Sequence, residues 1–287
     1  MVFYSDLDNT LIYSYKHDIG EEKRCVEIYQ GREVSFMTER SYQLLQKVNE
    51  KSLFVPVTTR TVEQYRRIDF GICAPGYALA CNGGILLVDG QKDMDWYRES
   101  REMAAGCQEE LHKAQKLLEK DRDVDFEIRD IEQLFLFTKS ARPRQTARKL
   151  QDALDPSLVD VFLNGAKVYV VPKILTKGNA VRRFQQRLWE ESQGGAGVLP
   201  GGYTGPQQGK DGIPCGTVAA GDSEFDIPML LEADVALAPK EMQGRGIKKR
   251  RLFYMDHEKV FSDFVLHYVD EAACRERIRW PECQFIN

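Results

Sequence analysis

Two aspartates near the start of the chain have a spacing that suits metal-assisted chemistry. Asp6 and Asp8 follow the apolar run at residues 2–4 and are separated by a single residue. Side chains in a β-strand alternate between the two faces of a sheet, so these carboxylates start out on the same side. Carboxylates this close raise each other's pKa and resist joint ionisation unless a cation neutralises them. Bound Mg²⁺, a hard ion that takes oxygen ligands, would leave one aspartate as a nucleophile and the other to transfer protons.

A hydroxyl side chain follows the next apolar run. Residues 53–57 are typical of a buried strand, and Thr58 comes directly after them. At the end of a parallel strand, the Thr58 hydroxyl would be available to donate a hydrogen bond to an anion. Threonine is common in strands and most such hydroxyls are structural, so Thr58 gains meaning only from the residues that accompany it.

A lysine occupies an unusual place after a third strand-like segment. Thr176-Lys177-Gly178 separates the apolar residues 168–171 from a helical pattern over residues 180–189. We interpret Thr176 as the N-cap of this helix, which places Lys177 in the first turn. A cation is unfavourable there, because the N-terminus of a helix carries partial positive charge. Neutralisation of a phosphoryl oxygen would explain the position; a solvated surface lysine is the alternative.

A second pair of aspartates follows a strand of small residues. Asp222 comes after the segment at residues 217–221, and Asp226 lies four positions later. If Ser223 caps a helix, the two carboxylates flank its first turn and could converge on one cation. Asp226 could instead only complement the helix dipole, which is a common role for an acid in a first turn.

The order of these segments resembles the haloacid dehalogenase (HAD) superfamily of phosphotransferases. The four motifs of that family are matched by residues 6–10, Thr58, Lys177 and residues 221–226. The chain is most similar to the Cof-type and sucrose-phosphatase-like phosphatases, which carry a cap domain between the second and third motifs. Residues 81–84 (Cys-Asn-Gly-Gly) and 226–230 (Asp-Ile-Pro-Met-Leu) carry this closer resemblance. Two residues depart from the pattern: Thr59 stands in place of a glycine, and Phe225 where many relatives have an asparagine.

The resemblance implies a role for each matched residue. Asp6 would attack phosphorus and form an aspartyl-phosphate, and Asp8 would protonate the leaving alcohol and then deprotonate water. The phosphoryl oxygens would be bound by Asn9, Thr58 and Lys177. The resemblance also implies Mg²⁺ as cofactor, held by Asp6, Asp8 through its backbone carbonyl, Asp222 and Asp226, the last one directly or through water. By analogy the substrate is a small phosphorylated metabolite such as a sugar phosphate.

The pattern of apolar segments predicts an α/β fold with a parallel, Rossmann-like HAD core and an inserted α+β cap. Alternating strands and helices favour a parallel sheet, whose ligands bind at the carboxyl ends of the strands. We assign residues 1–84 and 173–287 to the core and 85–172 to the cap. Core strands are expected at residues 2–6, 53–58, 77–81, 216–220, 234–237 and 251–255. Core helices are expected at residues 38–50, 61–67, 178–192, 223–232 and 257–270.

The segment assigned to the cap has a different pattern. It predicts strands at residues 84–88, 95–98, 125–129, 134–138, 158–163 and 167–171, with helices at 102–121 and 143–153. Asn164-Gly165 is a two-residue hairpin signal between the last two strands. Because a lid over the site reads the leaving group, substrate specificity is expected to lie in this segment. One of its basic residues could bind a second anionic group, or all could form the solvated face of a helix: Lys139, Arg142, Arg144, Arg148 and Lys149.

Composition excludes several other classes of function. The chain has 287 residues, 43% of them hydrophobic, and a net charge of −4, which provides no excess positive field for nucleic acid. No apolar stretch reaches the length of about 18 residues that a membrane helix needs. Seven scattered cysteines without a C-x-x-C pair are typical of reduced thiols, so we expect a cytoplasmic protein. A cleaved signal peptide would remove Asp6 and Asp8, so we expect a mature N-terminus close to Met1.

Three other functions remain open, and the oligomeric state is not predicted. A phosphomutase-type phosphotransferase would share every core motif but return the phosphoryl group to the sugar. A glycosyltransferase could use Asp6 and Asp8 to hold a metal and a nucleotide, although it would not need Lys177, Asp222 or Asp226. A non-catalytic binding protein is disfavoured because the acidic residues and Lys177 are all present.

Overall fold

The central element is a five-stranded parallel sheet. The computed structural model describes residues 1–71, 75–193, 216–255 and 260–279. The strand order is β15-β14-β13-β1-β5. The bounds are Val2–Ser5 for β1, Leu53–Pro56 for β5, Thr217–Ala220 for β13, Val235–Pro239 for β14 and Leu252–Met255 for β15. The neighbours pair in parallel throughout, which confirms the predicted α/β class with a Rossmann-like sheet.

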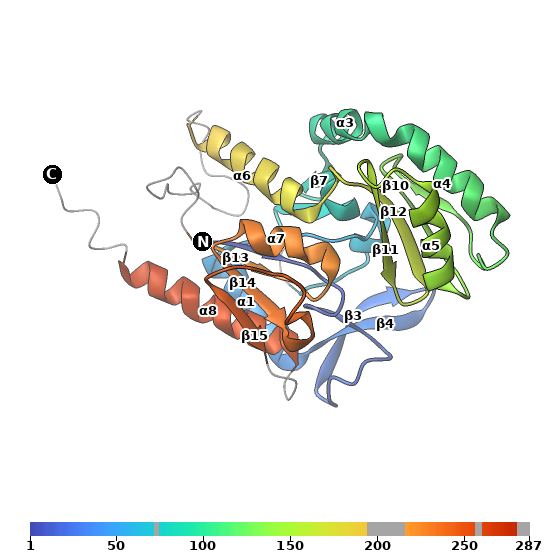
Figure 1. Ribbon diagram of the computed structural model, residues 1–287. Helices are drawn as coiled ribbons and strands as arrows, with labels where there is room; N and C mark the ends of the chain where they lie inside the picture. The colour runs from blue at the N-terminus through green and yellow to red at the C-terminus, as the bar shows by residue number, and fades with distance from the viewer. Residues whose placement is uncertain (72–74, 194–215, 256–259, 280–287) are drawn as a thin grey trace.

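Helices cover both faces of this sheet (Figure 1). Helices α1 (Glu39–Lys51) and α8 (Phe261–Arg279) bury apolar side chains with Phe3 and Phe54, whose rings stack at 5.5 Å. Helices α6 (Lys177–Gln193) and α7 (Ile227–Glu232) cover the other face, where Tyr4 contacts Phe184 edge to face at 6.3 Å. Successive residues of β1 thus point into two different cores, because strand side chains alternate in direction.

A small antiparallel sheet extends the core at its edge. Strand β6 (Tyr77–Ala80) touches the central sheet through one parallel bridge between Val57 and Leu79. It then pairs antiparallel with β7 (Ile85–Val88), which continues into β8 (Gln91–Lys92). The strands predicted at residues 77–81 and 84–88 are therefore both present. A very short helix, α2 (Val62–Tyr65), lies within the segment predicted as helical at residues 61–67.

A four-stranded antiparallel sheet carries two helices on one of its faces. Its order is β11-β12-β10-β9, with bounds Arg129–Ile131 for β9, Phe135–Lys139 for β10, Val159–Asn164 for β11 and Lys167–Pro172 for β12. Helices α4 (Gln108–Lys120) and α5 (Pro143–Ala153) pack on the face that holds Leu136, Val168 and Val170. The predicted β11–β12 hairpin is confirmed, although its turn falls on Gly165-Ala166, one residue later than expected.

Three predictions for the segment after residue 90 are wrong. The strand predicted at residues 125–129 is present only at its last residue, because β9 spans Arg129–Ile131. Residues 95–98, predicted as a strand, lie in helix α3 (Met94–Met103). Asp93 caps this helix by accepting a hydrogen bond from the backbone N of Trp96 at 2.8 Å, a signal that a strand pattern overlooks. The single helix predicted over residues 102–121 is interrupted by the 3₁₀ turn η2 (Ala105–Cys107) before α4 begins.

A three-stranded sheet between β1 and α1 was not predicted. It contains β2 (Tyr13–Ser14), β3 (Lys23–Tyr29) and β4 (Arg32–Thr38), in the order β2-β4-β3. The β3–β4 turn is Gln30-Gly31, and both residues have positive φ, at 50° and 74°. Two consecutive positive φ angles are typical of a type I′ hairpin turn, so the glycine was a usable signal. We refer to β3 and β4 as the hairpin.

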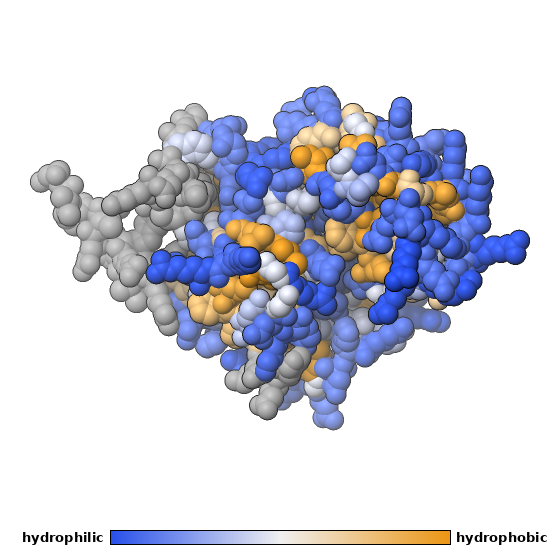
Figure 2. Space-filling view, viewed as in Figure 1, coloured by the Kyte–Doolittle hydropathy of each residue, from blue (hydrophilic) through white to orange (hydrophobic). Residues whose placement is uncertain are grey.

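Some predicted segments lie outside the described residues. Most of the glycine-rich loop predicted at residues 193–216 and the last residues of the tail fall there, as does the predicted start of the C-terminal helix at residue 257. Within the described residues no helix is long and apolar enough to cross a membrane. The face that carries α6, α7 and β11 is mostly hydrophilic, with separate hydrophobic patches (Figure 2).

Gly178 is expected to be required for the contact between α6 and α7. A Cβ at this position would lie 2.6 Å from the backbone C and O of Pro228, so Gly178→Ala should lower the free energy of unfolding by about 1–3 kcal/mol. Gly106→Ala is the control, because no heavy atom lies within 4 Å of a Cβ there. Urea unfolding of both variants measures the difference. Equal stabilities would contradict the close approach.

Candidate active site

The predicted residues meet at one edge of the parallel sheet. Asp6 follows β1, and its backbone N donates to the carbonyl of Ala220 at the end of β13, at 2.9 Å. On the other side, Val57 N donates to Ser5 O at 2.8 Å, which places Thr58 beside the same strand end. Parallel strands end on a common edge, and ligands bind there in folds of this type.

Lys177 is buried between two carboxylates. Thr176 accepts a hydrogen bond from Asn179 N at 3.1 Å, which confirms it as the N-cap of α6. The side chain of Lys177 is 1% exposed, and its Nζ lies 2.5 Å from Oδ1 of both Asp6 and Asp226. Burial alone would lower the pKa of Lys177, but Asp226 and Asp6 outweigh it and raise this pKa above its ordinary value. The alternative of a solvated surface lysine is therefore wrong.

Asp226 uses both carboxylate oxygens within the protein. Oδ1 accepts from Lys177, while Oδ2 accepts from Asp222 N at 3.1 Å, Ser223 N at 2.9 Å and Ser223 Oγ at 2.7 Å. Ser223 caps the 3₁₀ turn η4 (Glu224–Asp226) that leads into α7, as predicted. This buried carboxylate therefore ties α6 to the loop that carries Asp222.

Asp222 completes a group of three buried or partly buried carboxylates. One oxygen from each of Asp6, Asp222 and Asp226 lies within 4.8 Å of the others. Burial, followed by the charge of Asp226, raises the pKa of Asp222 to about 7, although the Thr10 hydroxyl, 3.2 Å away, and the Asn9 side chain oppose this. Burial also raises the pKa of Asp6 well above its ordinary value against the charge of Lys177, with Asp226 and Asp222 adding to the rise.

This group of carboxylates fits a divalent cation. Three carboxylates and one ammonium leave an excess of two negative charges when all are ionised, which a single Mg²⁺ would neutralise. Oxygens on opposite sides of Mg²⁺ lie about 4.2 Å apart. The three carboxylate oxygens, which lie within 4.8 Å of one another, would therefore have to move only slightly closer together to bind the ion. Asp6 and Asp222 have oxygen lone pairs to offer, whereas both oxygens of Asp226 already accept hydrogen bonds.

Asp8 is held by an arginine that the sequence analysis did not assign to the site. Arg60 donates from Nε and Nη2 to the two oxygens of Asp8, at 2.8 Å each. Burial alone would raise the pKa of Asp8, but the hydrogen bonds and charge of Arg60 lower it below its ordinary value. Arg60 Nη1 in turn donates to Glu27, a buried residue of β3, at 2.9 Å. Arg60 lies two residues after Thr58, so its sequence position could have indicated that it belongs to the site. Nothing in the sequence indicated Glu27, because the hairpin that carries it was not predicted.

Asn9 and Thr58 adjoin the site without bonding to each other. Asn9 occupies a turn at φ 60°, and its backbone N donates to Ile12 O at 2.8 Å. Thr58 is fully buried, and its Oγ1 accepts from Arg60 N at 3.1 Å. Their predicted binding of phosphoryl oxygens stays a prediction.

A cleft of about 530 Å³ opens beside Asp8, and its volume suits a small molecule. Three parts of the chain line it: the core, the hairpin and the four-stranded sheet. Representative residues are Asp8, Arg60, Tyr29, Ser35, Phe137 and Tyr169.

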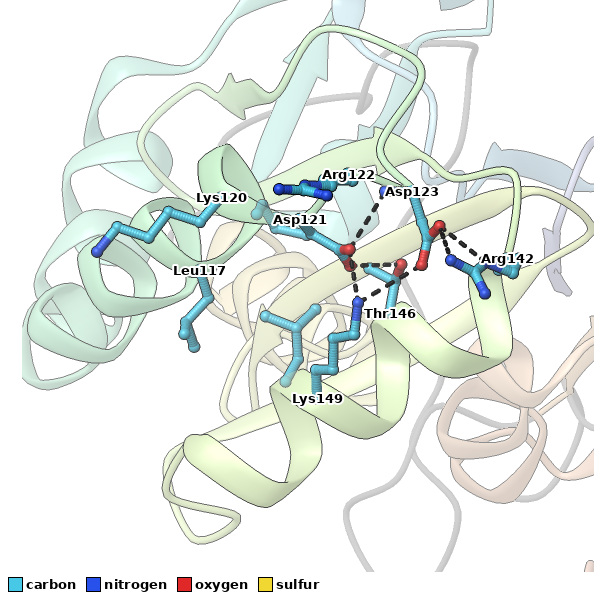
Figure 3. A pocket seen from close by; sticks show the side chains of 10 residues that line it. Leu117, Lys120, Asp121, Arg122, Asp123, Arg142, Thr146 and Lys149 are labelled. Atoms are coloured by element: carbon cyan, nitrogen blue, oxygen red, sulfur yellow. Dashed lines mark hydrogen bonds and ion pairs between the residues drawn. The ribbon is translucent and has the colours of Figure 1, made fainter.

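Only some of the basic residues predicted for substrate binding lie near this cleft. Lys139 lines it. Arg142 and Lys149 instead form ion pairs with Asp123 and Asp121 in a separate hollow between α4 and α5 (Figure 3). Arg144 and Arg148 are exposed on α5 and do not line the cleft.

Phe225, the departure from the family pattern, has a packing role. Its ring lies 4.3 Å from that of Phe162 and 5.3 Å from that of Tyr169, both in the four-stranded sheet. An asparagine could not form this apolar contact. The substitution therefore joins the loop of Asp222 to the sheet that lines the cleft.

The chain shares its fold with solved phosphatase structures. It is similar to sucrose-phosphatase from Synechocystis, with a TM-score of 0.58 and 17% identity over 95% of this chain and 97% of that one. For trehalose-6-phosphate phosphatase from Aspergillus fumigatus, the TM-score is 0.50 and the sequence identity 14%, over 96% of this chain and 93% of that one. For a phosphatase of the haloalkanoate (HAD) enzyme superfamily from Bacteroides thetaiotaomicron, the TM-score is 0.50 and the sequence identity 14%, over 94% of each chain. The sequence matches no protein-family model and no curated protein.

The chain therefore has the fold of the HAD phosphatases, as the motif resemblance implied. Within that fold, the likeness to sucrose-phosphatase covers nearly the whole length of both chains, including the segment between the second and third motifs.

Mg²⁺ is expected to stabilise the protein more at pH 8 than at pH 5.5. Without metal, the raised pKa values of Asp6 and Asp222 mean that the folded state holds protons that the unfolded chain has lost. The stability of the metal-free protein therefore falls as the pH rises from about 4 through about 7. Mg²⁺ binds the ionised carboxylates and must displace these protons at low pH. Thermal melts in EDTA and in Mg²⁺ measure the rise in melting temperature that Mg²⁺ causes at each pH. An equal rise at pH 5.5 and at pH 8 would contradict the proposed metal site.

Asp226→Asn and Asp222→Asn should have opposite effects. The Asp226 variant leaves the buried Lys177 without one of its two partners, so we expect a loss of about 3–5 kcal/mol of stability. The Asp222 variant removes excess negative charge, so the metal-free protein should be at least as stable as the wild type but should lose its stabilisation by Mg²⁺. Urea unfolding in EDTA, followed by Mg²⁺ titration, compares the two. The reverse order of stability would refute this division of roles.

Proposed function

We propose that this protein is a metal-dependent phosphatase that hydrolyses a small phosphorylated metabolite through an aspartyl-phosphate on Asp6. The observation that carries the proposal is the position of Asp6. Its buried carboxylate lies at a strand end, 2.5 Å from the Lys177 ammonium and within 4.8 Å of the Asp222 and Asp226 oxygens. The fold shared with HAD phosphatases supports the same reading.

The reaction would proceed in two displacements. In the first, an Asp6 oxygen attacks phosphorus, the ester P–O bond breaks, and the leaving alcohol takes a proton from Asp8. In the second, Asp8 accepts a proton from water as the water oxygen attacks the phosphorus of the aspartyl-phosphate. The bond between Asp6 and phosphorus then breaks, and inorganic phosphate leaves. Asp8 is ionised while it contacts Arg60, so it must leave Arg60 and take up a proton before the first displacement, and the proton that it accepts from water restores this state.

Positioned donors would stabilise the charge on the phosphoryl oxygens. Lys177 contacts the attacking carboxylate, so its ammonium lies next to any phosphorus bonded to Asp6. The Thr58 hydroxyl and the Asn9 side chain are the other donors in our proposal.

Asp6, Asp222 and the backbone carbonyl of Asp8 would hold Mg²⁺, with Asp226 acting through water. The ion, when bound, would supply positive charge beside the phosphoryl oxygens. Asp226 has a second task that needs no metal, because it orients Lys177.

Residues 85–172 would form the cap that selects the substrate, with residues 1–84 and 173–287 as the core. The first part of this segment packs on the core: Trp96 Nε1 donates to Gly83 O at 3.0 Å. The four-stranded sheet is the part that lines the cleft, so substrate recognition is assigned to its exposed face. A sugar phosphate fits the similarity to sucrose-phosphatase and trehalose-6-phosphate phosphatase.

Asp6→Asn tests the covalent mechanism. The amide has nearly the same shape but is a poor nucleophile, so turnover should fall by at least about 10³-fold while the melting temperature is retained. Release of free phosphate from p-nitrophenyl phosphate and from a panel of sugar phosphates, with Mg²⁺, is the measurement. Production of free phosphate also separates a phosphatase from a phosphomutase. Turnover at the wild-type rate in the purified variant, with contamination excluded, would contradict the covalent mechanism.

A further inference from the structure

Two lysines face each other on the cleft side of the four-stranded sheet. Lys139 in β10 and Lys167 in β12 are direct cross-strand partners, so their side chains leave the same face. Both line the cleft, together with Phe137 and Tyr169, the next residues on that face. The opposite face carries Leu136 and Val168, against α4 and α5. The lysines therefore belong to the substrate side of the sheet.

This arrangement is unfavourable for the folded protein alone. Like charges directly opposite each other in adjacent strands are destabilising. Within the described part of the chain, neither ammonium has an acidic partner. Other basic residues around this sheet do have one, as in the ion pairs Arg142–Asp123, Lys149–Asp121 and Lys173–Asp160. The two lysines therefore leave uncompensated positive charge on the cleft side of the sheet.

The whole cleft has an excess of positive charge. Two acidic side chains line its described wall, Asp8 and Glu27, against six basic ones: Lys16, Arg60, Arg67, Arg129, Lys139 and Lys167. Arg60 and Arg67 already pair with these acids, and Arg129 pairs with Glu127 outside the cleft. A concave surface lined by one sign of charge concentrates ligands of the opposite sign.

Aromatic side chains line the cleft beside the two lysines. The Nζ of Lys139 lies 4.5 Å from the centre of the Phe126 ring, and the rings of Phe137 and Tyr169 are 5.1 Å apart. Lys139, Lys167 and Asp8 line the same cleft of about 530 Å³, so one small molecule in that cleft can contact the lysines and lie next to the reacting group.

We propose that Lys139 and Lys167 form an anion subsite, and that the substrate is a small phosphate monoester whose leaving group carries a second anionic group. This rests on the proposed function, because the first phosphate is the one transferred to Asp6. The second group is a carboxylate, which would neutralise one of the two ammonium charges, or another phosphate, which would neutralise both.

Matched substrate pairs test the subsite. In the first pair, 6-phosphogluconate has a carboxylate that glucose 6-phosphate lacks. In the second pair, fructose 1,6-bisphosphate has a second phosphate that fructose 6-phosphate lacks. The wild type should prefer the member with the second anion in at least one pair, measured as a ratio of kcat/KM values. That ratio should fall by about tenfold in Lys139→Met and in Lys167→Met, since a hydrogen bond to a charged group contributes about this much. The pair that responds identifies the anion.

Lys116→Met is the matched control, because it removes one positive charge from an exposed position on α4 and should leave the ratio unchanged. The absence of a preference in both pairs, or an unchanged ratio in the two cleft variants, would overturn the subsite.

A binding measurement separates failure of the subsite from failure of the proposed function. Methylene bisphosphonate in EDTA should raise the melting temperature of the wild type and of Lys116→Met, and raise it less in the Lys139→Met/Lys167→Met double variant. If no substrate is hydrolysed, the proposed function fails, and this measurement still decides the subsite. Equal shifts in the wild type and the double variant would refute it. Without ligand, the double variant should melt no lower than the wild type, because the repulsion is gone.

Discussion

The contact of Lys177 with Asp6 and Asp226 is the interaction on which the rest of the site depends. It joins the end of β1, the start of α6 and the turn before α7, three segments that are far apart in sequence. All three groups are buried, so loss of Lys177 would leave two carboxylates without a counter-charge in a medium of low polarity. Asp226 also accepts three hydrogen bonds from residues 222 and 223, which fixes the loop of Asp222. The packing of the core and the geometry of the site therefore rest on the same contact.

The carboxylates that surround this contact have the excess negative charge that our proposed cation would neutralise. One ammonium cannot balance Asp6, Asp222 and Asp226, and the raised pKa values of Asp6 and Asp222 express the remaining repulsion. The protein can relieve that repulsion by taking up protons or by binding a divalent ion. Asp8, by contrast, is balanced by Arg60 and keeps a low pKa. The two aspartates of the first motif thus have different electrostatic environments although they are only two residues apart.

In our proposal, the four-stranded sheet connects this chemistry to the choice of substrate. Its apolar face is covered by helices, while its cleft face carries aromatic rings and the opposed pair Lys139 and Lys167. Phe225 bridges the two parts of the molecule, since it follows the Asp222 loop in sequence and packs on Phe162 of the sheet. Because of this contact, a movement of the sheet would displace the loop that carries the metal-binding carboxylates in our proposal.

The sequence alone determined the parallel sheet and the order of its motifs, because buried strands are continuous apolar runs and their carboxyl ends share one edge. It did not determine which groups pair across that edge. The contact of Asp8 with Arg60, the buried Glu27 behind it and the opposed Lys139 and Lys167 depend on register between distant strands. Local pattern also misjudged residues 95–98, where a capping aspartate and packing against the core favour a helix. Long-range pairing and burial decide such features, and neither is encoded in the spacing of neighbouring residues.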